Sequence, residues 1–177
     1  QCHRAAIYDT RDHHFHKKEG QEGEPITSGT GEVLFEVGTG AQCEQCHMPG
    51  RYYMGIDYRP DHSFRVPRPD LTAAVGVPNA CNRCHADKTP EWSSEYIVKW
   101  YGTKHKPHYG TVLEAGRRGN AEATDDLLRL VRDALSPTIV RATALTLLAN
   151  YQNDVATQAL EIAMLDQEAL LRQTALR

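Results

Sequence analysis

Two C-x-x-C-H motifs, Cys43–His47 and Cys81–His85, constrain this chain more than any other feature of its sequence. In such a motif two thiols add across the two vinyl groups of one porphyrin, and the two-residue gap sets their separation. The histidine that follows is placed to bind the iron as its proximal ligand. The sequence therefore predicts two covalent c-type haem sites, with porphyrin on Cys43, Cys46, Cys81 and Cys84 and iron on His47 and His85.

Two C-x-x-C pairs are also the ligand pattern of a structural zinc site, which is the main alternative for these cysteines. Zinc coordination by four thiolates gives no reason for a histidine directly after both pairs, and a disulfide framework gives none either. Haem attachment requires that histidine. The motifs therefore favour haem over zinc and over disulfides.

A fifth cysteine lies in Gln1-Cys2-His3, the same tripeptide as Gln45-Cys46-His47. We interpret it as the end of a third motif whose first cysteine precedes residue 1, with Cys2 on porphyrin and His3 on iron. The alternative is a free cysteine beside an unrelated histidine. The favoured interpretation predicts three haems here, and a fragment of a longer chain with more haems.

Composition narrows the class of protein. The 177 residues allow one or two domains, and a mean hydropathy of −0.56 with three Phe leaves little for an ordinary core. Buried porphyrin would supply the missing apolar surface. The formal charge of −3 and the absence of a basic stretch argue against a nucleic-acid partner. No apolar run long enough to span a membrane is present. Because c-type haem is attached after export, we expect a periplasmic or extracellular protein.

Histidines outside the motifs are candidates for the distal position on iron. His13, His14 and His16 form the densest cluster; His13 and His16 share a face on a helix, whereas His14 and His16 do so in extended chain. A solvated polar turn is the alternative. His62 stands between the motifs, beside Phe64 and arginines suited to haem propionates, and could instead be a surface histidine. His105 and His108 could also be ligands, but a surface loop is the favoured interpretation for them.

The chain around the motifs predicts a largely irregular scaffold. Residues 32–37 resemble a short strand inside the glycine-rich segment 19–42, and the proline-rich run 49–69 predicts extended, irregular chain. Residues 90–101 predict an amphipathic helix. Its aromatic side chains recur every four residues and are expected to cover a haem edge: Trp92, Tyr96 and Trp100.

From residue 120 the composition changes to one typical of helices. Leu127, Leu128, Val131 and Leu135 form one apolar stripe, and Ser136-Pro137 predicts an N-cap followed by proline at the first helical position. The segment 140–145 recurs at 171–176, which is typical of an α-solenoid. We expect a mainly α fold with much irregular coil: a multihaem cytochrome c domain over 1–110, then a HEAT-like solenoid over 120–177 that continues beyond the last residue.

Nearly the whole chain resembles multihaem c-type cytochromes that join C-x-x-C-H haem domains to TPR or HEAT-like repeats. The segments that carry the resemblance are Gln1-Cys2-His3, Tyr8-Asp9-Thr10, His13–His16, Cys46-His47-Met48-Pro49, Tyr53-Met54, Asp61–Arg65, Pro67–Asp70, Pro78–Cys81 and Trp100-Tyr101-Gly102. The resemblance implies mostly bis-His irons, with His13, His16 and His62 as distal ligands. The glycine-rich 20–42 segment is longer than the family's usual link, which leaves the pairing of histidines open.

These features predict an electron-transfer protein rather than an enzyme. Bis-His irons lack the Met ligand that raises haem potential, so low potentials are expected. The alternative is a multihaem oxidoreductase acting on a small nitrogen or sulfur species at an open haem outside this fragment. A binding scaffold with structural haems is a third possibility. Expected partners are other redox proteins or cytochromes, or copies of the chain associated into a haem array.

Overall fold

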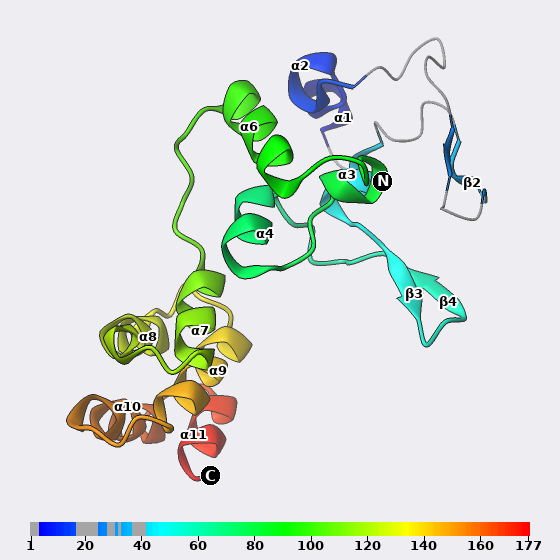
Figure 1. Cartoon of the computed structure of the whole chain (residues 1–177). Helices are drawn as coiled ribbons and strands as arrows, with labels where there is room; N and C mark the ends of the chain where they lie inside the picture. Colours follow the sequence, from blue (N-terminus) through cyan, green and yellow to red (C-terminus); the bar gives the residue numbers. More distant parts are fainter. Residues whose placement is uncertain (1–3, 17–24, 28–30, 32, 37–41) are drawn as a thin grey trace. The chain divides into compact units, whose positions relative to one another are not determined.

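The computed structural model describes residues 4–16, 25–27, 31, 33–36 and 42–177, so Cys2 and His3 lie outside the described residues. The described chain is mainly helical, as the sequence predicts. It divides into two compact units, residues 1–104 and 105–177, coloured blue to green and green to red in Figure 1. The expected first domain ended near residue 110 and the second began near residue 120. No described helix is long and apolar enough to cross a membrane.

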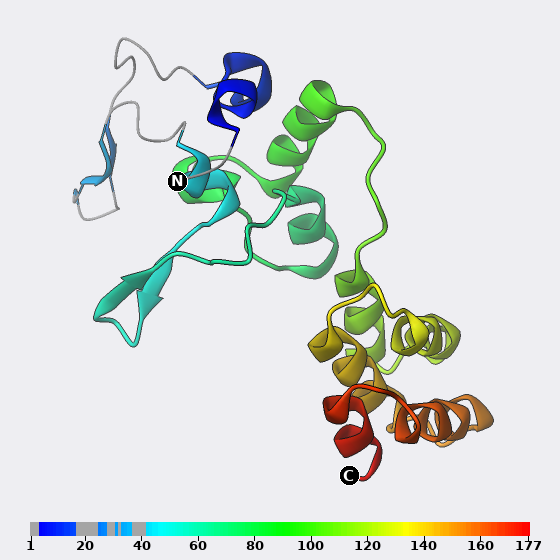
Figure 2. The same cartoon turned by 180° about the vertical axis from the view of Figure 1, so that it is seen from behind.

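The first unit is built from short elements. Its helices are α1 (Ala5–Tyr8), α2 (Arg11–His14), α3 (Cys43–His47), α4 (Pro69–Val75), α5 (Cys81–Cys84) and α6 (Pro90–Tyr101). Its strands are β1 (Ile26–Thr27), β2 (Val33–Phe35), β3 (Arg51–Tyr53) and β4 (Asp57–Arg59). The strands pair as two separate antiparallel hairpins, β1 with β2 and β3 with β4, which Figure 2 shows from behind.

The helix α6 matches the predicted segment 90–101 and is the longest in the first unit. Thr89 accepts a hydrogen bond from the Trp92 backbone N–H at 3.2 Å, and Pro90 occupies the first turn, where its missing N–H costs nothing. The helix packs against α4 and α5. It therefore forms the wall beside the second C-x-x-C-H motif.

The proline-rich run 49–69 is more regular than the sequence predicted. Arg51–Tyr53 pairs with Asp57–Arg59 in register, and Gly55 takes a positive φ of 76° in the turn that joins the two strands. Pro69 begins α4 at its first turn, a proline position that favours a helix. Only the part between the hairpin and α4 is irregular. The aromatic residues of the hairpin, which favour strands, outweighed the prolines around them.

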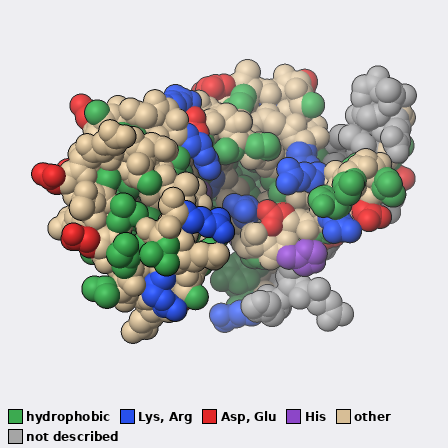
Figure 3. All heavy atoms as spheres, turned by 90° about the horizontal axis from the view of Figure 1, so that it is seen from below, with side chains coloured by type: hydrophobic (Ala, Val, Ile, Leu, Met, Phe, Trp, Pro, Cys, Tyr) green, Lys and Arg blue, Asp and Glu red, His purple; other side chains and the backbone are tan. Residues whose placement is uncertain are grey.

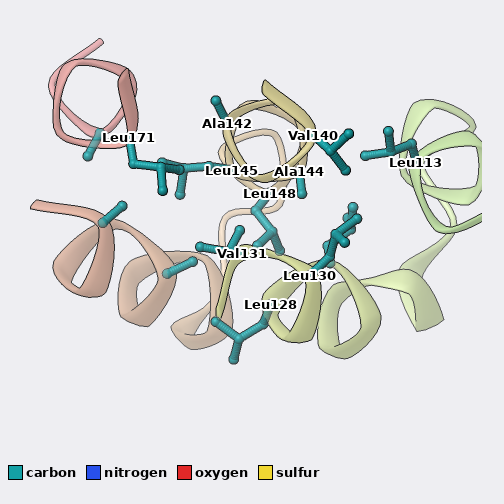
Figure 4. Packing of buried hydrophobic residues seen from close by; sticks show 14 of the residues in the cluster. Leu113, Leu128, Leu130, Val131, Val140, Ala142, Ala144, Leu145, Leu148 and Leu171 are labelled. Atoms are coloured by element: carbon teal, nitrogen blue, oxygen red, sulfur yellow. The ribbon is translucent and has the colours of Figure 1, made fainter. Parts of the chain in front are cut away.

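The second unit is a set of packed helices around one apolar core. The elements are α7 (Tyr109–Arg117), the 3-10 turn η3 (Ala121–Ala123), α8 (Thr124–Arg132), α9 (Thr138–Leu148), α10 (Asp154–Met164) and α11 (Ala169–Ala175). The helix α9 lies at the centre and contacts the four other α-helices. Figure 4 shows its side chains between α8, α10 and α11, where Leu145 and Leu148 are fully buried.

Arg141 links the helices of the second unit through a buried ion pair. Its guanidinium donates to the Val131 carbonyl at 2.9 Å and to the Asp166 carboxylate. Arg172 occupies the equivalent place in the internal repeat and donates to the carbonyls of Asp166 and Gln167 at 2.7 and 2.8 Å. Both repeat arginines therefore bind at the same turn, between α10 and α11.

Two details predicted for this unit are wrong. The side chain of Leu135 is 96 % exposed, because α8 ends at Arg132 and the leucine lies beyond the buried stripe. Ser136 is not an N-cap: α9 begins one residue later, with Pro137 as the N-cap. The Ser136 hydroxyl donates instead to the Asp133 carboxylate at 2.8 Å. Local turn bonds decided both positions.

Candidate haem-binding site

The first C-x-x-C-H motif forms α3, whose single helical stretch places the thiols of Cys43 and Cys46 one turn apart. Its histidine is held by the chain that follows the β3–β4 hairpin. The Nδ1 of His47 lies 2.8 Å from the Arg65 carbonyl, and the Arg65 N–H donates to the His47 carbonyl at 2.8 Å. A proton on Nδ1 leaves Nε2 as the ligand atom, which is how iron- and zinc-binding histidines are usually oriented.

Phe64 completes the support of His47. Its ring stacks on the imidazole at a centroid distance of 4.7 Å with planes 4° apart. Its backbone φ is 47°, a left-handed conformation that is strained for a phenylalanine. The chain therefore accepts backbone strain at the residue that fixes the plane of this histidine.

The second motif forms α5, and a network of amide hydrogen bonds fixes it. The Asn82 side chain donates to the carbonyls of His85 and Lys88 at 3.2 and 2.8 Å, and its oxygen accepts from Asn79 at 2.8 Å and Ser93 at 3.3 Å. The Asn82 N–H donates to the Asn79 side chain at 3.0 Å. A residue between the two cysteines thus holds the turn that carries the histidine.

This network also joins the second motif to the helices around it. Asn79 donates to Thr72 on α4 at 2.9 Å, and Ser93 on α6 is 1 % exposed. The sequence patterns did not predict this supporting role of Asn79, Asn82 and Ser93. The signal for it is the pair of asparagines three residues apart at the start of α5, because asparagine side chains commonly accept hydrogen bonds at helix ends.

The four thiols of the two motifs are half-buried and lie near one another. Burial, and after it the neighbouring Cys81, Cys84 and Cys43, raise the pKa of Cys46 to about 11. Burial also raises the pKa of Cys81 and Cys84. These shifts show an environment of low polarity shared by both motifs. Among the described residues, no three His, Cys, Asp or Glu side chains are arranged to hold a metal ion together, as four-cysteine zinc coordination would require.

His13 lies opposite His47. The ring centroids are 6.0 Å apart and the planes differ by 8°. Nearly parallel rings at this separation also occur as ordinary stacked pairs. Two imidazoles that share one iron have centroids about 6 Å apart, because each nitrogen lies about 2 Å from the metal. The separation of His13 from His47 therefore fits an iron between them.

His16 lies opposite His85 at a similar separation, 6.2 Å between centroids, with planes 38° apart. The Nδ1 of His16 is bonded to the His14 carbonyl, which leaves Nε2 as its ligand atom. Burial, and then the neighbouring His16, lower the pKa of His85, which favours the neutral imidazole that binds metal. Each motif histidine thus has one histidine of the N-terminal cluster at a centroid distance of about 6 Å.

The two other candidate ligands differ from these. The Nδ1 of His14 accepts the His16 N–H at 3.2 Å, and its Nε2 lies 3.8 Å from the Asp9 carboxylate. Both ring nitrogens of His14 therefore have protein partners. His62 is exposed, and its Nδ1 lies 2.9 Å from the Pro60 carbonyl. It faces neither motif histidine in the described part of the chain.

The aromatic stripe of α6 borders the second pair of histidines. Trp92 packs against His85 at 5.1 Å, and Trp100 against His16 at 6.0 Å, with Tyr96 between the two tryptophans. The Phe15 ring stacks on Trp100 at 4.8 Å with planes 1° apart. The stripe therefore reaches from one histidine of the pair to the other. An apolar porphyrin would find an apolar wall here.

The arginines expected to meet propionates already hold carboxylates of the protein. Arg65 donates to Asp61 at 2.7 Å, and Arg68 makes two bonds to Asp70 at 2.8 and 2.6 Å. Arg65 lies beside the first motif histidine, and Arg68 lies at the start of α4. Whether either arginine also pairs with a propionate stays a prediction.

Comparison with models of known families, with curated proteins and with solved structures gives no match to this chain.

Proposed function

We propose that the first unit binds c-type haem and that the protein transfers electrons between closely spaced haems. The observation that carries the proposal is the double pairing of histidines. Two motif histidines, each fixed in sequence by its own cysteine pair, face two histidines of one N-terminal segment at 6.0 and 6.2 Å. Structural zinc or disulfide cysteines would not require either pairing.

The residues have defined roles in this proposal. Thioether bonds form through Cys43 and Cys46 in one site and Cys81 and Cys84 in the other. His47 and His13 would hold the first iron, and His85 and His16 the second. Haem iron would supply one-electron chemistry.

The protein contributes orientation and shielding. Phe64 and the Arg65 carbonyl fix the plane and tautomer of His47, whereas Asn82 holds the turn that carries His85. The α6 stripe excludes water from one side of the second site. With two histidines on each iron, these sites would be suited to electron transfer rather than to binding a substrate.

The proposal also includes a third haem, bound by Cys2 and His3, which lie outside the described residues. His62, which faces neither of the other motif histidines, serves that haem or another one.

The second unit is proposed to be a HEAT-like solenoid, which the two repeat arginines bound at one turn support. The protein works in the periplasm or outside the cell, with other cytochromes or copies of itself as partners.

The chain produced in a host that matures c-type cytochromes tests the proposal. Intact mass should rise by three haems, two of them attached through paired thioethers, and a redox titration should show low midpoint potentials because no Met ligates iron. Zinc without iron in the purified protein would contradict haem binding. A high-potential His/Met centre would contradict the assignment of two histidines to each iron.

The distal ligands are tested by matched variants in one segment. His13→Ala should create a high-spin iron that binds carbon monoxide, whereas His14→Ala should leave the low-spin spectrum unchanged. His62→Ala should also create a high-spin iron if it ligates the third haem. Equal spectra for His13→Ala and His14→Ala would remove His13 from the assignment.

A further inference from the structure

Tyr58, on β4, contacts the second C-x-x-C-H motif and the chain just after the first one. Its ring lies against Gly50, which follows the first motif by three residues, and its hydroxyl accepts a hydrogen bond from Arg83 at 2.8 Å. Arg83 is one of the two residues between the cysteines of the second motif. The two contacts place one side chain between two segments that are far apart in sequence.

The contact with Gly50 is closer than any side chain would allow. A Cβ at that position would lie 2.6 Å from Cζ, 2.7 Å from Cε1 and 2.8 Å from Oη of Tyr58. Such distances require the tyrosine ring or the backbone to move. Gly50 is also buried. The absence of a side chain here therefore sets how near the first motif comes to the hairpin.

The rest of the hairpin holds Tyr58 in this place. Tyr52 lies directly across from it in the β3–β4 register, with ring centroids 5.4 Å apart, and the Arg59 guanidinium covers Tyr53 at 4.7 Å. The tip is otherwise exposed, with Met54 at 81 % and Ile56 at 82 %. Figure 3 shows exposed hydrophobic side chains, in green, on one face of the chain. Tyr58 is 47 % exposed, less than Met54 and Ile56.

We infer that Tyr58 is a positioning residue that sets the spacing between the two haem motifs. The inference rests on the proposed function. The rate of electron transfer falls steeply with distance, so the residues that hold two cofactors apart influence that rate. Tyr58 has one contact with Arg83 inside the second motif and one with Gly50, three residues after the first.

The holoprotein carries the test, and the readouts are those of haem interaction rather than of activity. Two nearby porphyrins give a split circular dichroism signal in the Soret region, whose intensity depends on their distance and orientation. The separation of their successive midpoint potentials depends on the same spacing. Both should change in Gly50→Ala, where the ring must move, and to a smaller extent in Tyr58→Phe, which loses only the hydroxyl.

Matched variants separate positioning from general damage. Tyr52→Phe on the facing strand should leave both readouts unchanged, because in the described part of the chain its ring contacts Tyr58 and neither motif. In an Arg83→Met background, Tyr58→Phe should add nothing, because the hydrogen bond is already lost. If Gly50→Ala fails to load haem, the pair Tyr58→Phe and Arg83→Met still decides the question.

The failures are distinguishable. A wild-type chain without haem contradicts the proposed function itself. Full haem loading in Tyr58→Phe with the wild-type dichroism and the wild-type potentials overturns only the role of Tyr58. A wild-type holoprotein without a split signal overturns it as well, because haems that do not interact have no spacing for this residue to set.

Discussion

The two compact units bury apolar side chains to very different extents. In the second unit, leucines, valines and alanines from five helices form one continuous cluster around Leu145 and Leu148. In the described part of the first unit, Pro69 and Leu71 are the only buried apolar side chains. Tyrosines, Phe64 and other apolar residues remain exposed there. The second unit therefore carries its own apolar core, whereas the described part of the first unit does not.

Removal of haem attachment should produce the largest effect and should confine it to one unit. Replacing Cys43, Cys46, Cys81 and Cys84 with serine should leave the first unit without cofactor and without enough buried surface to fold. Limited proteolysis should then cleave before residue 105 and spare the second unit, which should keep its helical circular dichroism. Equal protease resistance of both units would show that the first unit folds without haem.

A cavity in the second unit should cost several kcal/mol. Leu145 is fully buried between helices, and Leu145→Ala should lower the free energy of unfolding of this unit by about 2–5 kcal/mol. Leu135→Ala is the matched control, since that leucine is exposed and should change it by less than about 0.5 kcal/mol. Thermal unfolding monitored by circular dichroism measures both. Similar losses would contradict the assigned core.

The amide network of the first unit should have an intermediate effect. Asn82→Ala removes the hydrogen bonds of its side chain to Ser93 and to the carbonyls of His85 and Lys88, which should cost about 1–3 kcal/mol of the holoprotein's stability. Haem should still attach, because both cysteines and the histidine remain. Denaturant titration followed at the haem absorption measures the change. No loss of stability would show that haem alone holds the second motif.

The smallest effect should be one of pH on the second unit. Hydrogen bonds from the Ser136 hydroxyl and the Leu135 N–H hold the pKa of Asp133 below its usual range. A lowered folded pKa means that the carboxylate stabilises the unit above its unfolded pKa of about 3.9 and that this contribution is lost as the pH falls through the folded pKa. Asp133→Asn should flatten the acid side of the stability profile slightly. A profile identical to wild type would contradict it.

Local sequence patterns predicted the elements and not their long-range partners. The spacing of aromatic residues gave the bounds of α6, and the fixed C-x-x-C-H order predicts which histidine serves which cysteine pair. The facing of His13 with His47 depends on chain far apart in sequence, which no local pattern encodes. Leu135 was misplaced because helix periodicity continues in sequence after the helix itself has ended. Tyr58 lies in a run whose prolines obscured a hairpin.

His13 and His16 lie three residues apart, one on α2 and one just beyond it, and they are paired with different motif histidines. Phe15 between them has a left-handed φ of 56° and stacks on Trp100. Under the proposed function, displacement of this short segment would remove both N-terminal histidines from their partners together.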